Sequence, residues 1–333
     1  MLRLPPFTYL APRTAAEAVD MLGRHGNDVM PVAGGTDLFP NMKRRQFEPR
    51  ILVGLRGLKE LQGIRGSGLE GMTIGAGCTL TEVADHPAVQ QAYPALARAA
   101  GWVSTPQLRT MGTIGGNLCV DTRCTYYNQT YAWRRAIGFC MKKDGDICLV
   151  APTSPRCWAV SSSDTAPVVI ALGGTLRLVG PGGGRTIPAQ ALYNDDGIKY
   201  LAKDPREILC EIHLPPADGW RATYWKLRRR GSFDFPILGV AAALKQAPDG
   251  TVEDARIVLG AAYPTPVVVE QARMLVGKRL TPELIESVAQ SASGPAKPLD
   301  NTDLTMWYRK RMARVYIARA LRELAGLPVT PAA

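Results

Sequence analysis

Histidine and long apolar segments are scarce in this chain of 333 residues. It holds three histidines, each beside a predicted helix end, a proline or a strand end, and no nucleophile–base pair or carboxylate pair stands out. No apolar run approaches the roughly 18 residues that a membrane span needs. Residues 1–22 contain no apolar core of signal-peptide length. We therefore expect a cytoplasmic protein without a membrane contact, in which the histidines are structural.

Several nucleotide-binding and nucleic-acid-binding motifs are also missing. The sequence contains neither the G-x-G-x-x-G of a Rossmann fold nor a G-x-x-x-x-G-K-[ST] loop. The net charge is +11, but the basic residues are spread along the chain with acids between them, and no motif of a nucleic-acid reader accompanies them. We expect no nucleic acid as a partner. Two basic concentrations, residues 226–230 and 123–158, fit an acidic protein or an anionic ligand better.

Cysteine, in contrast, is concentrated in one irregular segment. Four of the seven cysteines have the spacing C-x15-C-x7-C-x8-C and are Cys124, Cys140, Cys148 and Cys157. An odd total and a reducing compartment argue against disulfides and favour a metal site. The spacing matches neither the C-x2-C pairs of zinc ribbons nor the usual ferredoxin run, so the metal stays open. Structural zinc and simple burial of the thiols are the alternatives.

The other three cysteines are interpreted separately. Cys78 and Cys210 lie in strand-like apolar runs and are expected to be buried core residues. Cys119 stands just before the cluster and is a fifth candidate ligand.

Residues 123–158 show no lasting period of 2 or 3.6. An irregular segment of this length is uncommon in a compact domain and is usually functional or disordered. Its aromatic residues argue against disorder, and they are Tyr126, Tyr127, Tyr131, Trp133, Phe139 and Trp158. Its basic residues outnumber Asp144 and Asp146, and they are Arg123, Arg134, Arg135, Lys142, Lys143 and Arg156. A bound metal would supply the core that this segment lacks.

The rest of the chain alternates short strands and helices, and the dipeptide Pro215-Pro216 marks a boundary. Before it, the patterns predict a helix over 15–24, one or two helices over 80–100 interrupted by Pro87 and Pro94, and a helix over 166–172 capped by Ser163 or Asp164. They predict strands over 29–33, 51–55, 72–76, 175–179 and 207–214. Beyond it, they predict antiparallel strands over 222–230, 236–246 and 254–262 and helices near 267–275, 281–291 and 303–325. We expect an α+β protein of two or three domains.

Two segments with adjacent glycines carry further chemistry, Val32-Ala33-Gly34-Gly35-Thr36-Asp37-Leu38 and Thr113-Ile114-Gly115-Gly116-Asn117. A backbone without side chains can approach a diphosphate closely and present N–H donors to its oxygens. Asp164 could then accept from ribose or ribityl hydroxyls. The alternative is a plain turn between a strand and a helix.

Four sequence stretches carry a family resemblance: AGGTDL, TIGGN, SSDTAPVVIAL and WKLRRRGSFDFPILGVAAAL. In this order, over almost the whole chain, they resemble the FAD-binding subunit of molybdenum hydroxylases, the family of xanthine dehydrogenase and carbon monoxide dehydrogenase. The resemblance implies a vanillyl-alcohol-oxidase-type FAD-binding domain of two subdomains over residues 1–215. It implies a C-terminal α+β domain over residues 216–333, with a three-stranded antiparallel sheet and helices.

The resemblance also implies where FAD would be bound. Contacts to its diphosphate and ribityl groups would fall on Pro31, Val32, Ala33, Gly34, Gly35, Thr36, Asp37, Leu38, Thr113, Ile114, Gly115, Gly116 and Asn117. Val103 and Ile208 would add backbone or apolar contacts. Asp164 would accept from flavin hydroxyls, and Lys226 would lie near the isoalloxazine ring, where a cation favours reduced flavin.

The cysteine segment is unusual within this family, and its spacing resembles the insertion in the β subunit of 4-hydroxybenzoyl-CoA reductases. There the four cysteines hold an additional 4Fe-4S cluster, which implies Cys124, Cys140, Cys148 and Cys157 as its ligands here. Cys119 is left out, because it follows the second glycine segment in relatives without the cluster. The basic side chains of residues 123–158 would offset the cluster's negative charge and guide an acidic electron carrier.

The implied function is electron transfer, with no catalytic residue for substrate chemistry on this chain. Electrons would pass from reduced ferredoxin through the 4Fe-4S cluster and FAD to two 2Fe-2S clusters on a small subunit. They would end at a molybdenum cofactor on a large subunit, in an (αβγ)2 assembly. There, in anaerobic aromatic degradation, 4-hydroxybenzoyl-CoA would be reduced to benzoyl-CoA and water.

Two alternatives to this function stay open. One is a flavin subunit of a xanthine dehydrogenase-like enzyme that passes electrons outward to NAD or a quinone. The other is a non-redox protein with a structural zinc site.

Overall fold

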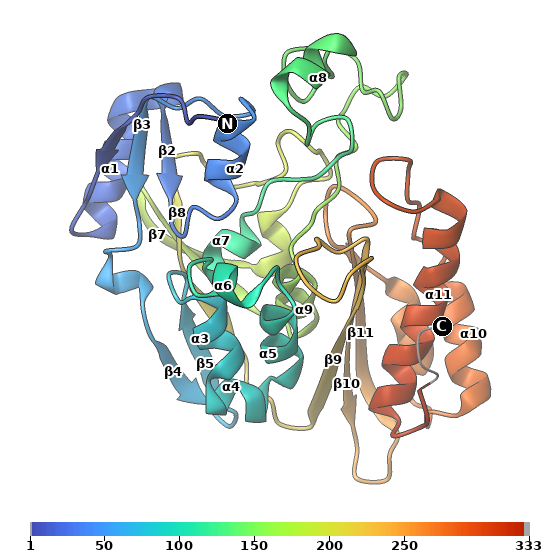
Figure 1. Ribbon diagram of the computed structural model, residues 1–333. Helices are drawn as coiled ribbons and strands as arrows, with labels where there is room; N and C mark the ends of the chain where they lie inside the picture. Colours follow the sequence, from blue (N-terminus) through green and yellow to red (C-terminus); the bar gives the residue numbers. More distant parts are fainter. Residues whose placement is uncertain (1, 330–333) are drawn as a thin grey trace.

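Three separate β-sheets organise the chain, and helices fill the spaces between and outside them (Figure 1). The computed structural model describes residues 2–329. The strands are β1 Thr8–Leu10, β2 Val29–Val32, β3 Ile51–Gly54, β4 Ile64–Ser67, β5 Gly71–Gly75, β6 Thr175–Gly180, β7 Gly183–Pro188, β8 Ile208–Leu214, β9 Trp220–Leu227, β10 Leu238–Gln246, β11 Val252–Gly260 and β12 Val267–Val268. The helices are α1 Ala15–His25, α2 Leu38–Lys43, α3 Leu80–Asp85, α4 Pro87–Ala92, α5 Pro94–Gly101, α6 Pro106–Arg109, α7 Ile114–Leu118, α8 Tyr131–Ala136, α9 Thr165–Ala171, α10 Pro282–Ala292 and α11 Met306–Leu324.

The first sheet is parallel, in the order β1-β3-β2. Helix α1 packs against it because Ala18 and Leu22, one turn apart, are buried in one cluster with Val53 of β3. Ile208 of β8 belongs to the same cluster, which joins this sheet to the next. The carboxyl end of β2 is thereby fixed at the point where the chain turns toward α2.

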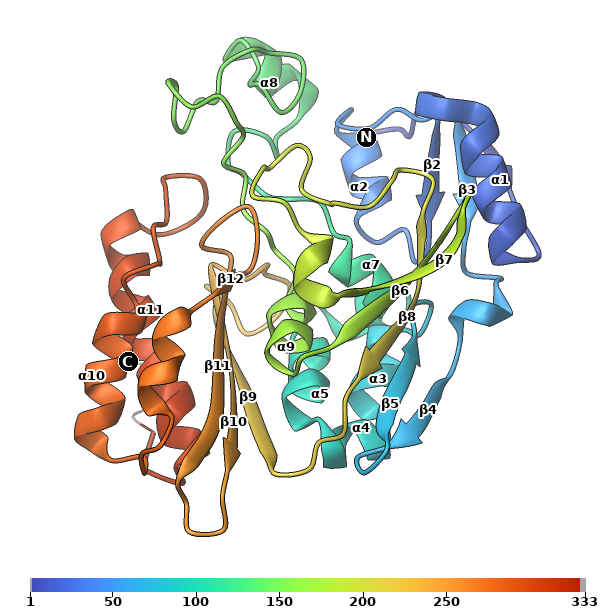
Figure 2. The same ribbon diagram turned by 180° about the vertical axis from the view of Figure 1, so that it is seen from behind.

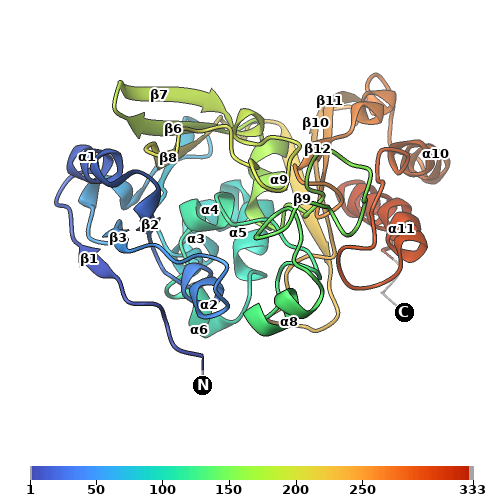
Figure 3. The same cartoon turned by 90° about the horizontal axis from the view of Figure 1, so that it is seen from above.

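The second sheet is antiparallel, in the order β4-β5-β8-β6-β7. Its apolar residues share one large core with α3, α4, α5 and α9. The stretch 80–100 is interrupted at Pro87 and Pro94 as predicted, but it forms three helices instead of one or two, because each proline begins a new helix. Every residue of α9 is buried, since this helix lies between the second and third sheets (Figure 3).

The third sheet is antiparallel, in the order β12-β11-β10-β9, and α10 and α11 cover its outer face (Figure 2). The expected three strands are present, but the sheet has a fourth, β12, which is too short to show a period. A 3-10 helix, Glu270–Leu275, occupies the rest of the helix expected over 267–275. Among residues 2–329, no helix combines the length and apolar character needed to cross a bilayer.

The cysteine-bearing segment is a closed loop that stands away from the sheets and includes α8 (Figure 1). Arg123 and Val160 exchange two backbone hydrogen bonds of 2.8 Å, which join the ends of the loop. The helix α8 lies inside it, where no regular structure was expected, and Thr130 caps it by accepting from Trp133 N at 3.3 Å. Six residues are too few for a helical period to stand out in the sequence. We call residues 123–160 the insertion.

Glu323 on α11 ties the third sheet to the FAD-binding half predicted from the sequence. Its carboxylate accepts from both terminal nitrogens of Arg98 on α5, at 2.7 and 3.1 Å. It also accepts from Thr223 Oγ1 at 2.8 Å and Trp225 Nε1 at 2.7 Å, both on β9. One partly buried carboxylate therefore satisfies donors from two other elements.

We expect Glu323→Ala to lower the free energy of unfolding by about 2 kcal/mol, because it leaves the Arg98 guanidinium without its acid. Urea denaturation followed by tryptophan fluorescence measures this change. Glu286→Ala on α10 is the control, since it removes ion pairs that are largely open to solvent and is expected to change stability by less than about 1 kcal/mol. Equal effects of the two substitutions would contradict this role of Glu323.

Candidate functional site

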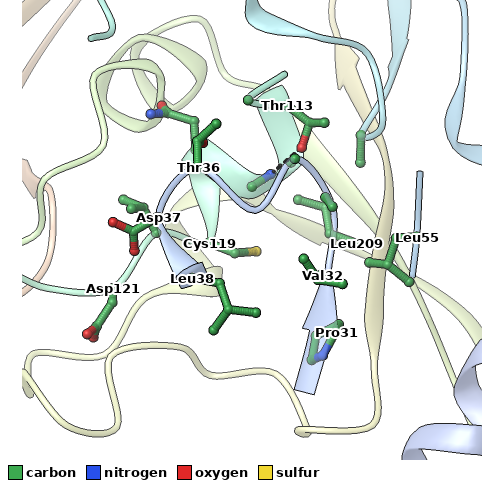
Figure 4. Close-up of a pocket in the computed structure, with 18 of the residues that line it drawn as sticks. Pro31, Val32, Thr36, Asp37, Leu38, Leu55, Thr113, Cys119, Asp121 and Leu209 are labelled. Carbon is green, nitrogen blue, oxygen red and sulfur yellow. Dashed lines mark hydrogen bonds between the residues drawn. The ribbon is translucent and has the colours of Figure 1, made fainter. Parts of the chain in front are cut away.

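A cavity of about 850 Å³ lies where the first and second sheets meet α7 (Figure 4). This volume is at the upper end of the roughly 300–1,000 Å³ of small-molecule and cofactor sites. Its walls come from β2 with the turn that follows, the start of α7, β8, and the irregular residues 194–207 and 233–235. The lining is mixed, with apolar side chains beside a few convergent polar groups.

The residues that the sequence predicts at a flavin site line this cavity, with two exceptions. Those on its wall are Pro31, Val32, Ala33, Gly34, Gly35, Thr36, Asp37, Leu38, Val103, Thr113, Gly115, Gly116, Asn117, Asp164 and Ile208. Ile114 is fully buried in the core behind α7. Lys226 lies behind the wall, where its side chain contacts Asp164. The two glycine segments, about 80 residues apart in the sequence, therefore meet on one surface.

The turn after β2 passes so close to residues 111–112 that it requires glycine. A Cβ atom on Gly34 would lie 1.9 Å from the Met111 carbonyl oxygen. Glycine at this position therefore allows the turn to pack against residues 111–112, and residues 31–38 line the cavity beside this contact.

The second glycine segment is the start of α7. Thr113 caps this helix, with Oγ1 accepting from Gly116 N at 3.0 Å. The Asn117 side-chain oxygen accepts from Ser163 Oγ, Thr165 N and Thr165 Oγ1, at 2.9, 3.1 and 2.7 Å. These bonds fix α7 against the start of α9 and so place Asn117 at the wall.

Asp164 is the buried carboxylate of the cavity wall. Its two oxygens accept from Tyr224 OH at 2.8 Å and from Lys226 Nζ at 2.9 Å. Lys226 also donates to the Trp102 carbonyl at 2.9 Å. Burial raises the pKa of Asp164 and lowers that of Lys226, and the ion pair opposes both shifts. The helix cap expected from Ser163 or Asp164 comes from Ser163, whose Oγ accepts from Ala166 N at 3.0 Å.

One wall of the cavity was missed at the sequence level. It includes Asn194 and the consecutive residues Ile198, Lys199, Tyr200, Leu201, Ala202 and Lys203, with Pro205 and Glu207. These residues share no motif, and the turn signal Asp195-Asp196-Gly197 was the sole hint of an irregular segment.

Asp121 was missed as well, and it carries an unused acceptor. One of its carboxylate oxygens accepts from Lys142, and the other is buried without a hydrogen-bond partner. Because Asp121 lines the cavity, a ligand hydroxyl could satisfy this oxygen. Asp121 and Asp164 are thus two acidic side chains on the wall of this cavity.

The four cysteines of the insertion line a second, small cavity. Cys124, Cys140, Cys148 and Cys157 are all buried, and the other lining residues are Tyr126, Tyr127, Met141, Lys142, Leu149, Val150 and Ala159. The lining has four thiols and neither imidazole nor carboxylate, a donor set that all-thiolate iron–sulfur sites and four-cysteine zinc sites share. Cys119 lines the large cavity instead.

The thiol cavity is closed around its sulfurs. It encloses about 10 Å³, room for one water, so a four-iron cluster requires the cysteine segments to move apart. Residues 141–156 contain no helix or strand to resist such a movement. Across residues 2–329, no three His, Cys, Asp or Glu side chains are arranged to hold a single metal ion.

Burial governs the ionisation of two of these thiols. It raises the pKa of Cys124 to about 12, and neighbouring cysteines add to the effect. It raises the pKa of Cys157 to about 11, while the Lys142 cation opposes the shift. Both thiols therefore carry protons at neutral pH, which a metal must displace when it binds.

Most of the basic side chains of the insertion are paired with acids. Arg123 pairs with Asp37, Arg134 with Asp144, Lys142 with Asp121, Lys143 with Asp144, and Arg156 with Asp195. Arg135 on α8 is exposed and has no acidic partner within the described chain. Most of this positive charge therefore forms ion pairs that hold the insertion, and Arg135 on α8 is exposed to solvent.

The two cavities share a wall at Gly197. Its backbone N donates to the Cys157 carbonyl at 2.9 Å, and a Cβ atom on it would lie 2.7 Å from Cys157 Sγ. The next residue, Ile198, lines the large cavity. Glycine is therefore required at this point of the wall, where the chain packs against Cys157.

Comparison with known proteins agrees with this arrangement. Residues 5–217 match the model of the FAD binding domain in molybdopterin dehydrogenase, and residues 222–324 match the CO dehydrogenase flavoprotein C-terminal domain. The carbon monoxide dehydrogenase medium chain of Hydrogenophaga pseudoflava is 30% identical over 95% of this chain and 96% of its own length. The aldehyde oxidoreductase FAD-binding subunit of Escherichia coli is 32% identical over 80% of this chain and 84% of its own.

A solved structure shows the same fold over nearly the full length. This structure is the carbon monoxide dehydrogenase of Hydrogenophaga pseudoflava, in a form that lacks the Mo-pyranopterin moiety of the molybdenum cofactor. One of its chains superimposes on this chain with a TM-score of 0.79 and is 30% identical to it in sequence. The match covers 96% of this chain and 97% of that one. Because the first family model alone matches more than half of the residues, this chain belongs to the FAD-binding subunits of the molybdenum hydroxylase family.

Proposed function

We propose that this chain holds FAD in the large cavity and a 4Fe-4S cluster in the thiol cavity, and that it transfers electrons between them. FAD, when bound, exchanges electrons with both one-electron and two-electron partners. The turn at Gly34 and Gly35 and the start of α7 would donate backbone N–H groups to the diphosphate. Asp164 and Asp121 would accept from hydroxyls, while Lys226 holds Asp164 in place from behind the wall.

The observation that carries the proposal is the position of the four-thiol cavity, one residue away from the flavin cavity. Gly197 touches Cys157, and Ile198 lines the large cavity. A purely structural zinc site needs no such neighbour. Two redox centres placed on either side of one thin wall are suited to direct electron exchange. The resemblance of the cysteine spacing to 4-hydroxybenzoyl-CoA reductases supports the same assignment of the ligands.

The reaction follows from this placement and from the family. The name "medium chain" among the relatives indicates a larger and a smaller partner chain, which we assign to the molybdenum cofactor and the 2Fe-2S clusters. Electrons from a reduced ferredoxin would enter at the thiol site and leave from the flavin. On the large subunit, two electrons and two protons would convert 4-hydroxybenzoyl-CoA to benzoyl-CoA and water. No residue of this chain takes part in that step.

A second candidate function is supported by the relatives themselves. Several are named dehydrogenases, for carbon monoxide, glyceraldehyde and nicotinate, and a dehydrogenase takes electrons from its substrate. In this second function, electrons would move in the opposite direction, from the oxidised substrate through the flavin to NAD or a quinone. Activity assays of the complex with reduced ferredoxin and with NAD distinguish the two directions of electron flow. Turnover of 4-hydroxybenzoyl-CoA with reduced ferredoxin supports the first function. Reduction of NAD that depends on an aldehyde or a purine supports the second function.

Gly34→Ala tests the flavin site. The added Cβ would meet the Met111 carbonyl, so the turn must shift, and we expect FAD affinity to fall at least about tenfold. Flavin released per polypeptide and equilibrium dialysis measure it. Gly182→Ala is the control, because a Cβ there meets nothing within 4 Å and full flavin content is expected. Full flavin content in Gly34→Ala would place the cofactor elsewhere.

Cys140→Ser tests the metal site and the electron route. We expect the anaerobically purified variant to lose most of its iron and its ferredoxin-driven reduction of substrate, while it keeps FAD. Cys210→Ser, a buried thiol of β8 away from the insertion, should keep its iron. Zinc in place of iron in the wild type, or undiminished turnover after the cluster is lost, would refute the proposed route.

Arg135→Glu tests the docking of an acidic carrier on α8. Reversal of this exposed charge should lower the second-order rate constant for reduction by ferredoxin about fivefold at low ionic strength, and less in high salt. Stopped-flow absorbance measures the rate. Arg13→Glu, an exposed charge just before α1, should leave it unchanged. Equal rates in both variants would exclude α8 from the docking surface.

A further inference from the structure

The start of α11 exposes several large apolar side chains in a row. Trp307 is 78% exposed, Tyr308 is 44% exposed, and Leu304 and Met306 are each 39% exposed. Single exposed apolar residues are normal on a protein surface, whereas a group of them marks an interaction site. We call residues 304–308 the α11 patch.

The α11 patch belongs to a firmly anchored helix. The next residue, Arg309, is buried, and its guanidinium donates to the carbonyls of Leu299 and Ala261, both at 2.8 Å. Thr305 caps the helix by accepting from Tyr308 N at 3.3 Å. The exposed side chains therefore stand on a fixed turn of helix. A surface that is already formed loses less conformational entropy when a partner binds.

Leu304 adds an independent sign that this surface has a use. Its φ is 67°, a left-handed value that leucine rarely adopts. The side chain is also largely exposed, so burial in the core of this chain does not offset the strain. Backbone strain of this kind is typical of functional segments. A contact with another molecule would account for a leucine that is both strained and exposed.

The α11 patch lies in a basic stretch without acids. Residues 304–322 include six basic side chains and no acidic one. Lys310 and Arg311 follow Trp307 by three and four residues, so they share its face of the helix. Both are exposed, and neither forms an ion pair within residues 2–329. Asp303, one turn before Trp307, already pairs with an arginine that follows β9. The surface around Trp307 is therefore positive, and the complementary surface is acidic.

We propose that the α11 patch is the docking surface of a permanent partner subunit, whose contacting face has an apolar centre with acidic residues around it. The inference rests on the partner chains of the proposed function, but it needs neither the flavin nor the cluster. Obligate interfaces are more apolar than transient ones, and tryptophan, tyrosine and arginine contribute most to binding. An electron carrier must leave after each transfer, so an apolar patch fits a subunit that stays bound.

Trp307→Ala, in the purified complex, tests this docking surface. We expect a labelled chain to exchange out of the complex, into an excess of unlabelled chain, about ten times faster or more. The flavin content should stay unchanged, because the side chain is largely outside the core. Leu69→Ala is the control, since this leucine is 82% exposed in the turn between β4 and β5, at the opposite end of the molecule (Figure 1). An unchanged exchange rate in Trp307→Ala overturns the proposal.

The double substitution Lys310→Glu and Arg311→Glu tests the charge of the partner, and it leaves Trp307 in place. The rate constant for association of the full chain with its partner subunits should fall about tenfold at low ionic strength, and less in high salt. Stopped-flow fluorescence of the labelled chain measures it. Arg13→Glu, an exposed charge just before α1, should keep the wild-type rate constant. The same rate constant in the double variant would exclude an acidic partner at the α11 patch.

Two other occupants give different results with the same variants. Slower reduction of the complex by ferredoxin, with unchanged subunit exchange, would assign the α11 patch to the carrier and overturn the proposal. Binding of the complex to phosphatidylglycerol vesicles that is lost in Trp307→Ala, again with unchanged exchange, would assign it to a membrane surface. A wild-type chain that purifies without any partner subunit refutes the assembly in the proposed function. A wild-type complex whose variants exchange and associate normally refutes only the docking surface.

Discussion

The arrangement of both sites depends on the need to pair every buried charge. An unpaired charge in a protein interior costs several kcal/mol, so a buried cation must be placed where an acid or a carbonyl receives it. Arg123 meets Asp37 at the glycine turn, and Arg134 meets two carbonyls at the end of α2 together with Asp144. These pairs hold the insertion against the segment that begins the flavin cavity. The basic residues of the insertion therefore serve first to hold it in place.

The same constraint shapes the flavin cavity. Asp164 is fully enclosed, and Lys226 and Tyr224 share one face of β9 because they are two residues apart on a strand. Both reach the carboxylate from behind, which leaves the cavity side of the wall for a ligand. Asp121 repeats the pattern with Lys142. In each pair an acid lines the cavity and a lysine supports it from outside.

Local patterns were enough to predict much of the fold and of the candidate site. The glycine turns, the strands that carry them and Asp164 could be predicted because they depend on short-range geometry. The clustering of the four cysteines in the sequence also predicted that their thiols lie together. The position of Lys226 depends on strand register and neighbours, which no local period shows. The wall at Asn194 and Ile198–Lys203 is irregular, and tertiary packing alone brings it to the cavity. Likewise, the sequence did not show that Lys142 and Arg134 are buried, because charge counts carry no information on partners.

The proposed function requires electrons to cross the wall at Gly197 between a cluster and a flavin. The most direct measurement is rapid anaerobic mixing of the complex with reduced ferredoxin, with the iron–sulfur and flavin absorbance followed separately. We expect the iron–sulfur signal to be bleached first and the flavin to be reduced at the rate at which the cluster is reoxidised. Flavin reduction that precedes reduction of the cluster, or that proceeds at full rate without the cluster, would refute this electron route.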